Sequence, residues 1–205
     1  MIPDTFNPTN VTDTCAVWHL VGADTLFRTA RRVNVSFILT PTVLYECFVK
    51  KRTSPPTEER LALRARLQAH LDGRRISEVG MSIEDLQETM IFAKRHQLEK
   101  RIGQGELSCV ALARHLGHAA VLTDNKRDFA AIGMLVDGRL QKTPQLLGWL
   151  LCEGHLTDSD VDEVVREHEA SGGQMAKILR TAYEKACEKR LMSQFAQAKK
   201  EHWSG

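Results

Sequence analysis

The chain has 205 residues, of which 42% are hydrophobic and 26% charged, so it carries enough apolar material for one folded core with an extension. Its formal net charge of +2 gives no global attraction to nucleic acid, so such a partner would have to meet a local basic patch. No apolar run approaches the roughly 18 residues of a membrane span, and the N-terminus lacks the basic and apolar segments of a secretion signal.

The five cysteines are odd in number and widely spaced, and most lie inside apolar runs: Cys15, Cys47, Cys109, Cys152 and Cys187. This pattern predicts reduced, buried thiols in a cytoplasmic protein. The absence of a C-x-x-C motif argues against a thiolate zinc site.

The first third of the chain alternates short strands with helices. A strand is predicted to end at Thr12, with Asp13 at its carboxyl end. An apolar helix over 15–21 and a second helix over 24–32 follow. A second strand, 35–40, leads into a helix that begins at Thr40-Pro41, carries Glu46 and ends before Pro55-Pro56.

Residues 57–72 alternate apolar and polar side chains, but their composition favours a helix. A short strand over 75–79 and a helix from 82 to about 100 follow. Glu106 then begins an apolar helix that ends at Gly117, and a strand over 119–122 leads to Asp124, with Asp128 one helical turn further on.

Beyond this segment we expect a strand over 133–136 and a helix from Thr143-Pro144 that ends at Gly154. Helices over 157–170 and 174–202 complete the chain, the last with a row on one side formed by Leu179, Tyr183, Ala186, Leu191, Phe195 and Ala198. The alternation predicts an α/β fold with a central parallel sheet of four or five short strands flanked by helices.

The acidic residues of this pattern follow strands or open helices: Asp13, Glu46, Glu106, Asp124 and Asp128. In an open parallel sheet these positions meet at one edge. Several carboxylates at one site repel one another unless a cation compensates. Oxygen ligands favour Mg²⁺ or Mn²⁺, and such an ion can activate a water for attack on a phosphodiester.

Four segments resemble, in order, the four acidic motifs of PIN-domain nucleases: V-T-D-T-C-A-V-W-H-L, T-P-T-V-L-Y-E-C, G-Q-G-E-L-S-C-V-A-L-A and V-L-T-D-N-K-R-D-F. The resemblance covers roughly residues 11–150. It implies a Rossmann-like PIN fold, with a nuclease domain over 1–154 and a helical C-terminal extension over 155–205.

The resemblance also implies a metal-dependent endoribonuclease that binds Mg²⁺ or Mn²⁺ through Asp13, Glu46, Glu106 and Asp124. The last motif of the family varies in which acid it uses, so the alternative that Asp128 or Asn125 shares or takes the role of Asp124 stays open. Thr14 is implied as a polar helper. Many PIN domains are toxins of toxin–antitoxin pairs, so RNA as substrate, an antitoxin or other protein partner and a homodimer are expected, with no membrane contact.

Lys126 and Arg127 lie between the last two acids, so they are predicted to hold a phosphate backbone beside the metal site, with Thr14 and Asn125 as further nucleic-acid contacts. The alternative for these basic residues is a solvated face. The extension is polarised: residues 156–170 carry six acids, and 171–205 carry seven bases against three acids. It is read as two helices packed on the domain or as a dimer, antitoxin or nucleic-acid contact.

Each acid also has a structural alternative: Glu46 as a surface pair with Lys50, Glu106 as a charge favoured at a helix start, and Asp13 and Asp128 as helix caps. Two other functions stay open. One is a non-catalytic PIN-like module that binds RNA or a protein, and the other is a DNA flap or single-strand nuclease with the same site.

Overall fold

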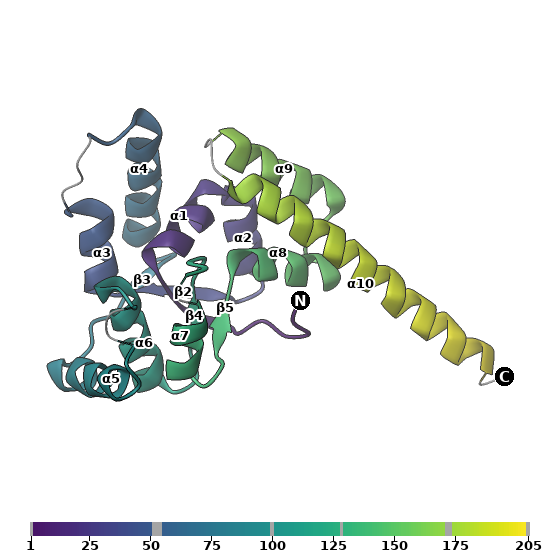
Figure 1. Ribbon diagram of the computed structural model, residues 1–205. Coiled ribbons are helices and arrows are strands. Elements are labelled where there is room, and N and C mark those ends of the chain that lie inside the picture. The colour runs from purple at the N-terminus through teal and green to yellow at the C-terminus, as the bar shows by residue number, and fades with distance from the viewer. Residues whose placement is uncertain (1, 51–54, 99–100, 128, 171–173, 204–205) are drawn as a thin grey trace.

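The structure of the protein, a computed structural model, describes residues 2–50, 55–98, 101–127, 129–170 and 174–203. Five parallel strands form one sheet in the order β3-β2-β1-β4-β5 (Figure 1). The strands are β1 (Thr9–Thr12), β2 (Ser36–Leu39), β3 (Ser77–Glu78), β4 (Ala120–Leu122) and β5 (Leu140–Gln141). The predicted α/β fold with a parallel sheet is therefore confirmed, and it is consistent with a Rossmann-like architecture.

Ten helices are present within these described ranges. They are α1 (Thr14–Gly22), α2 (Asp24–Arg32), α3 (Pro41–Phe48), α4 (Glu58–Asp72), α5 (Ile83–Arg95), α6 (Gln104–Leu116), α7 (Phe129–Leu135), α8 (Thr143–Cys152), α9 (Asp158–Ala170) and α10 (Met175–Trp203).

The helices form two groups around the sheet. Helices α1, α2, α4, α8 and α9 pack with one another, α5 and α7 both contact α6, and α3 contacts α1 and α6. The central strand β1 pairs with β2 on one side and β4 on the other, and α6 packs on β1 and β4. The chain therefore changes direction across the sheet next to β1, which is where ligands bind in open parallel sheets.

Several helix ends follow directly from local sequence. The Thr40 side chain accepts a hydrogen bond from Val43 N at 3.2 Å, and Pro41 opens α3, as predicted. Gly117, with φ +69°, ends α6 in the left-handed region that favours glycine. The alternating segment 57–72 forms the helix α4, in agreement with its composition.

The predictions for the segments 133–136 and 82–100 were wrong. The apolar run 133–136 is not a strand: it ends the helix α7, and the fifth strand is β5, after the Asp137-Gly138 turn. So short a run has no period that separates a strand from a helix. The segment 82–100 is helical only to Arg95, and residues 99–100 lie outside the described residues.

The prediction that one side of the last helix is buried along its whole length is also wrong. Leu191 and Phe195 were expected to share a side with Ala186, but they are 54% and 71% exposed, whereas Ala186 is buried. Five residues separate Ala186 from Leu191, which at about 100° per residue turns the side chain by roughly 140°. Within the described ranges, no helix is both long and apolar enough to cross a membrane.

One buried histidine joins the extension to the core. His168 of α9 is 3% exposed and packs over Gly22 at the end of α1, where an added Cβ would lie 3.4 Å from the His168 ring. Its Nε2 has no hydrogen-bond partner among the described residues. Burial, with the charge of the neighbouring His19 as a smaller cause, lowers the pKa of His168 from its usual 6.5 to about 4.

This depressed pKa predicts acid sensitivity. Between pH 6.5 and about 4, His168 is protonated in the unfolded chain but neutral in the folded chain. The free energy of unfolding therefore decreases as the pH falls through this window. Compared with His168→Gln, the wild type should lose up to about 1.4 kcal/mol more per pH unit in the free energy of unfolding. Urea denaturation at several pH values measures this difference.

The matched control is His118→Gln, which changes an exposed histidine. It should follow the wild-type pH dependence. Parallel stability curves for the wild type and His168→Gln between pH 6.5 and 4 would contradict the prediction.

Candidate active site

Asp13 stands at the centre of the carboxyl edge of the sheet. It follows β1 directly, and its backbone N–H donates to Leu122 O of β4 at 3.0 Å. Asp13 as a whole is only 2% exposed. One carboxylate oxygen accepts a hydrogen bond from Ala16 N at 2.7 Å, and the other accepts one from the Thr123 hydroxyl. Asp13 is thus the N-cap of α1, as the structural alternative held, and it is also fixed toward β4.

The environment of this carboxyl disfavours its charge. Burial raises the pKa of Asp13 to about 7, against the lowering effect of the bonds from Thr123 and Ala16. Negative charge on Asp124 and Glu106 raises the same pKa further. Of the acids predicted to repel one another at this edge, Asp124 and Glu106 thus act on Asp13.

Glu46 comes to the edge from α3. Its Oε2 accepts a hydrogen bond from the Thr14 hydroxyl at 2.6 Å, and its Oε1 pairs with Lys50 Nζ at 3.0 Å. A Cβ built on Gly105 would lie 2.6 Å from Glu46 Oε2. The surface pair expected as a structural alternative is present, yet the same carboxylate also reaches α1 and the start of α6.

Glu106 lies in the first turn of α6, where a negative charge is favoured by the helix dipole. Its Oε1 accepts a hydrogen bond from Asn125 Nδ2 at 3.1 Å. A Cβ on Gly103 would collide with the other carboxylate oxygen of Glu106. The two glycines that flank Gln104 therefore leave room for two different carboxylates.

Asp124 follows β4 and is almost fully buried, with a side-chain exposure of 4%. Its carboxylate contacts His19 Nδ1 at 2.7 Å and accepts hydrogen bonds from Thr143 N at 3.0 Å and Thr143 Oγ1 at 2.6 Å. Both of its oxygens are therefore engaged by residues of α1 and α8.

Sequence reasoning missed three of these partners: His19, Thr123 and Thr143. The position of Thr123, directly between a predicted strand and a predicted site residue, is a usable signal. His19 and Thr143 contact Asp124 from 105 and 19 residues away, and no local pattern indicates these contacts.

The thiol of Cys15 lies within electrostatic range of all four carboxylates. Cys15 is exposed, contrary to the prediction of a buried thiol, whereas Cys47 and Cys109 are buried as predicted. Desolvation raises the pKa of Cys15 to about 12, with further contributions, in decreasing order, from the charges of Asp13, Glu106, Asp124 and Glu46. One side chain thus feels all four predicted acids.

The side chains are not, however, arranged as a ligand sphere. Among the residues that the structure describes, no three histidine, cysteine, aspartate or glutamate side chains are grouped as they would be around a metal ion. Each carboxylate instead accepts a hydrogen bond from a neighbouring side chain. The fifth predicted ligand, Asp128, lies outside the described residues.

The predicted nucleic-acid contacts divide into two kinds. Thr14 and Asn125 bind carboxylates, so they position Glu46 and Glu106. Lys126 and Arg127 are exposed just beyond Asp124. Arg127 N donates to Asn125 Oδ1 at 3.1 Å, which shapes this turn.

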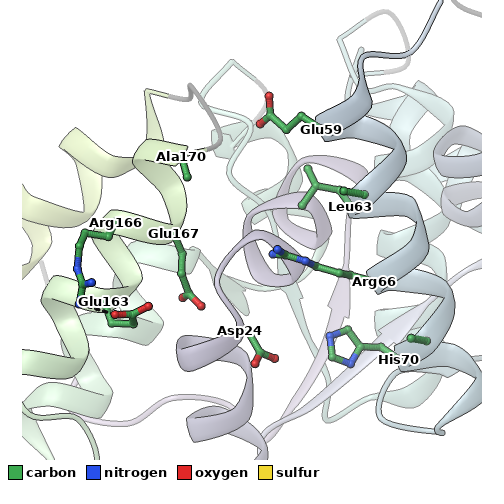
Figure 2. Close-up of a pocket in the computed structure, with 11 residues that line it drawn as sticks. Asp24, Glu59, Leu63, Arg66, His70, Glu163, Arg166, Glu167 and Ala170 are labelled. Carbon is green, nitrogen blue, oxygen red and sulfur yellow. Dashed lines mark ion pairs between the residues drawn. The ribbon is translucent and has the colours of Figure 1, made fainter.

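A separate cavity of about 700 Å³ lies between α4 and α9, and none of the four carboxylates lines it (Figure 2). Arg66 of α4 points into it, toward the side that carries Asp24 and Glu167. Burial, together with the nearby acids Asp24 and Glu163, raises the pKa of Glu167. Basic and acidic side chains face one another here, so the cavity lacks the single-sign acidic character of the sheet edge.

Neither the family models nor the curated proteins with which the chain was compared match it.

The first prediction from this geometry concerns Gly105→Ala. The added methyl group would displace Glu46 from Thr14, while stability should change by no more than about 1 kcal/mol because the end of Glu46 can swing away. For the Mn²⁺ ion that the sequence predicts at this edge, the affinity should fall roughly tenfold, as for loss of a group that orients a ligand. Calorimetric titration measures it.

Gly80→Ala is the matched control, because a Cβ there meets nothing within 4 Å. It should bind Mn²⁺ like the wild type. Equal affinities for the two alanine variants would show that the position of Glu46 does not matter for the cation.

The second prediction concerns Cys15. Alkylation by iodoacetamide should be slow at pH 8, since the thiolate is disfavoured, and should accelerate roughly tenfold for each unit by which the pKa falls. Both Asp13→Asn and added Mn²⁺ remove negative charge, so both should accelerate the reaction. Mass spectrometry of the peptide that contains Cys15 gives the rate.

Asp137→Asn removes an exposed carboxylate, with a side-chain exposure of 85%, and should leave the Cys15 rate unchanged. Insensitivity of Cys15 to Asp13→Asn would mean that the carboxylates do not act on this thiol.

Proposed function

We propose that the protein is a metal-dependent endoribonuclease of the PIN class that cleaves single-stranded or structured RNA. The observation that carries this proposal is that four carboxylates lie at the carboxyl edge of the sheet: Asp13 and Asp124 follow β1 and β4, Glu46 is hydrogen-bonded to Thr14 beside Asp13, and Glu106 is hydrogen-bonded to Asn125 beside Asp124. The order of the four acidic motifs in the sequence supports the same class.

The donor set fits a hard divalent cation. Asp13, Glu46 and Glu106 would hold Mg²⁺ or Mn²⁺, with Asp124 as the fourth acid, because these ions prefer carboxylate oxygens. The raised pKa of Asp13 marks a place where added positive charge is favourable. A cation bound there would supply Lewis acidity toward a water and a phosphodiester.

The chain's own residues supply orientation. Thr14 and Asn125 hold Glu46 and Glu106 in place through their hydrogen bonds, and the Thr123 hydroxyl holds Asp13. Lys126 and Arg127 are exposed beside this edge and would bind phosphates without reading bases. Lys50 has a side-chain exposure of 59% and pairs with Glu46. When Glu46 reorients toward a bound cation, Lys50 would be released to bind a further phosphate.

The PIN resemblance supports a toxin or defence effector as the biological role, acting on RNA in the cytoplasm and restrained by an antitoxin or another protein. The extension over 155–205 is the part of the chain that departs from the common small toxins. It is therefore the part in which a partner specific to this protein would bind.

A second candidate is a non-catalytic module that uses the same edge to bind RNA or a protein. The observation in its favour is that both oxygens of Asp124 already have partners. Oδ1 accepts a hydrogen bond from Thr143 N, and Oδ2 accepts one from Thr143 Oγ1 and contacts His19 Nδ1, while Glu46 pairs with Lys50. On this interpretation the acids are structural, and removing one would lower stability without any effect on cleavage.

The test is replacement of Asp13 by Asn and, separately, of Glu106 by Gln. Each change keeps the shape of the side chain and removes a negative charge, so cleavage of single-stranded RNA in Mn²⁺ should fall by roughly a hundredfold or more. Chromatography of a labelled RNA measures cleavage, and thermal unfolding checks that the variants fold.

Asp137→Asn, at a side-chain exposure of 85%, is the control and should cleave at the wild-type rate. Undiminished cleavage by either site variant would eliminate the proposed site. Folded wild-type protein that binds no Mn²⁺ and cuts no RNA would favour the non-catalytic module, and preference for DNA flaps or single-stranded DNA would change the substrate class.

A further inference from the structure

The cavity between α4 and α9 has two walls with different charges (Figure 2). From α4, Arg66 and His70 reach it. The start of α2 and helix α9 form the other wall, which carries Asp24, Glu163 and Glu167. None of the four carboxylates of the sheet edge lines this cavity, so what binds here is independent of the proposed nuclease function.

Arg66 brings a positive charge into the cavity without a direct partner. Among the described residues it forms no ion pair and no hydrogen bond. Its charge opposes the burial that raises the pKa of Glu167, so the two side chains lie within electrostatic range across the cavity. A guanidinium group in this state can take a carboxylate through two parallel N–H bonds.

His70 supplies a second, independent sign of a ligand. It is only 6% exposed, and its ring centroid lies 4.2 Å from that of Phe27. Its Nδ1 is buried and has no hydrogen-bond partner among the described residues. Figure 2 shows the ring turned from α4 toward the side that carries Asp24. Buried polar atoms without a partner are rare in folded proteins, so a polar group inside the cavity is the partner that this nitrogen lacks.

The lining as a whole favours a cation. Its carboxylates outnumber its guanidinium groups by two: Asp24, Glu59, Glu163 and Glu167 against Arg66 and Arg166. Arg166 is already paired with Glu163. After burial, the charges of Asp24 and Glu163 are the causes that raise the pKa of Glu167, so a positive charge beside this carboxylate would be stabilised.

We propose that this cavity binds a free diamino acid, such as lysine or arginine. The carboxylate of the ligand pairs with Arg66, its cationic groups bind at the wall of Asp24 and Glu167, and one of its N–H groups donates to His70 Nδ1. Two positive charges and one negative charge match both the acidic excess and the guanidinium group of Arg66. The volume of about 700 Å³ is ordinary for a small-molecule site.

Calorimetric titration of the full chain with L-lysine tests the proposal, alongside two analogues that each lack one charge. Cadaverine has no carboxylate, and L-norleucine has no side-chain ammonium group. Each analogue should bind roughly ten- to a hundredfold more weakly than L-lysine, as for loss of a hydrogen bond between charged groups.

Two variants assign the charges to the two walls. Arg66→Gln should weaken binding of L-lysine roughly tenfold but should not weaken binding of cadaverine, which has no carboxylate to lose. Glu167→Gln should weaken binding of both. The control is Arg95→Gln, which changes an exposed arginine of α5 outside the cavity and should bind every ligand like the wild type.

His70→Phe separates a binding role of this ring from a structural one. The change keeps an aromatic ring beside Phe27 and removes a buried nitrogen without a partner, so the free protein should unfold at no lower temperature than the wild type. Binding of L-lysine should nevertheless weaken roughly tenfold. Unchanged affinity in this variant would overturn the contact with His70.

A wild type that binds L-lysine and L-arginine no better than L-norleucine at up to about 1 mM overturns the proposal. So does a loss of cadaverine binding in Arg66→Gln equal to the loss of L-lysine binding. Nα-acetyl-L-lysine amide presents the side chain as a polypeptide does, without a free carboxylate. If it binds as tightly as L-lysine, the cavity takes a side chain of a protein partner instead of a free amino acid.

Discussion

The carboxyl edge of the sheet depends on keeping the Asp13 carboxyl buried between β1 and β4. A carboxylate at 2% exposure is tolerated only because Ala16 N and the Thr123 hydroxyl donate to it. Its two donors come from the helix that follows β1 and from the end of the neighbouring strand. The same group thus caps α1, joins two strands and sets the negative potential that the other acids enlarge.

The other three carboxylates solve the same physical problem in different ways. Glu46 remains partly exposed and is paired with Lys50, Glu106 uses the start of a helix and Asn125, and Asp124 is enclosed by groups from α1 and α8. Structural and functional interpretations of these acids therefore do not exclude each other. The bonds that make each carboxylate tolerable also hold it at the carboxyl edge of the sheet, which is where the proposed function needs it.

The sequence predicted the parts of the fold that local chemistry decides. Helix α2 was predicted over its observed range, and Thr40-Pro41 and Gly117 mark helix ends because their backbone preferences are strong. The run 133–136 was misread because a short apolar segment is compatible with either structure. The carboxylates could be anticipated from strand ends, but His19 could not, because its contact with Asp124 joins residues that are distant in the sequence.

The bond between Thr123 and Asp13 spans 110 residues, which has a consequence for the order of synthesis. A growing chain that has delivered β1 still lacks β4, and the start of α8, which encloses Asp124, comes later still. Because contacts so remote in sequence form only when both partners have been made, the carboxyl edge cannot assemble on a nascent fragment. The carboxyl edge of the sheet would therefore be completed only after the segment that contains Thr143 had left the ribosome.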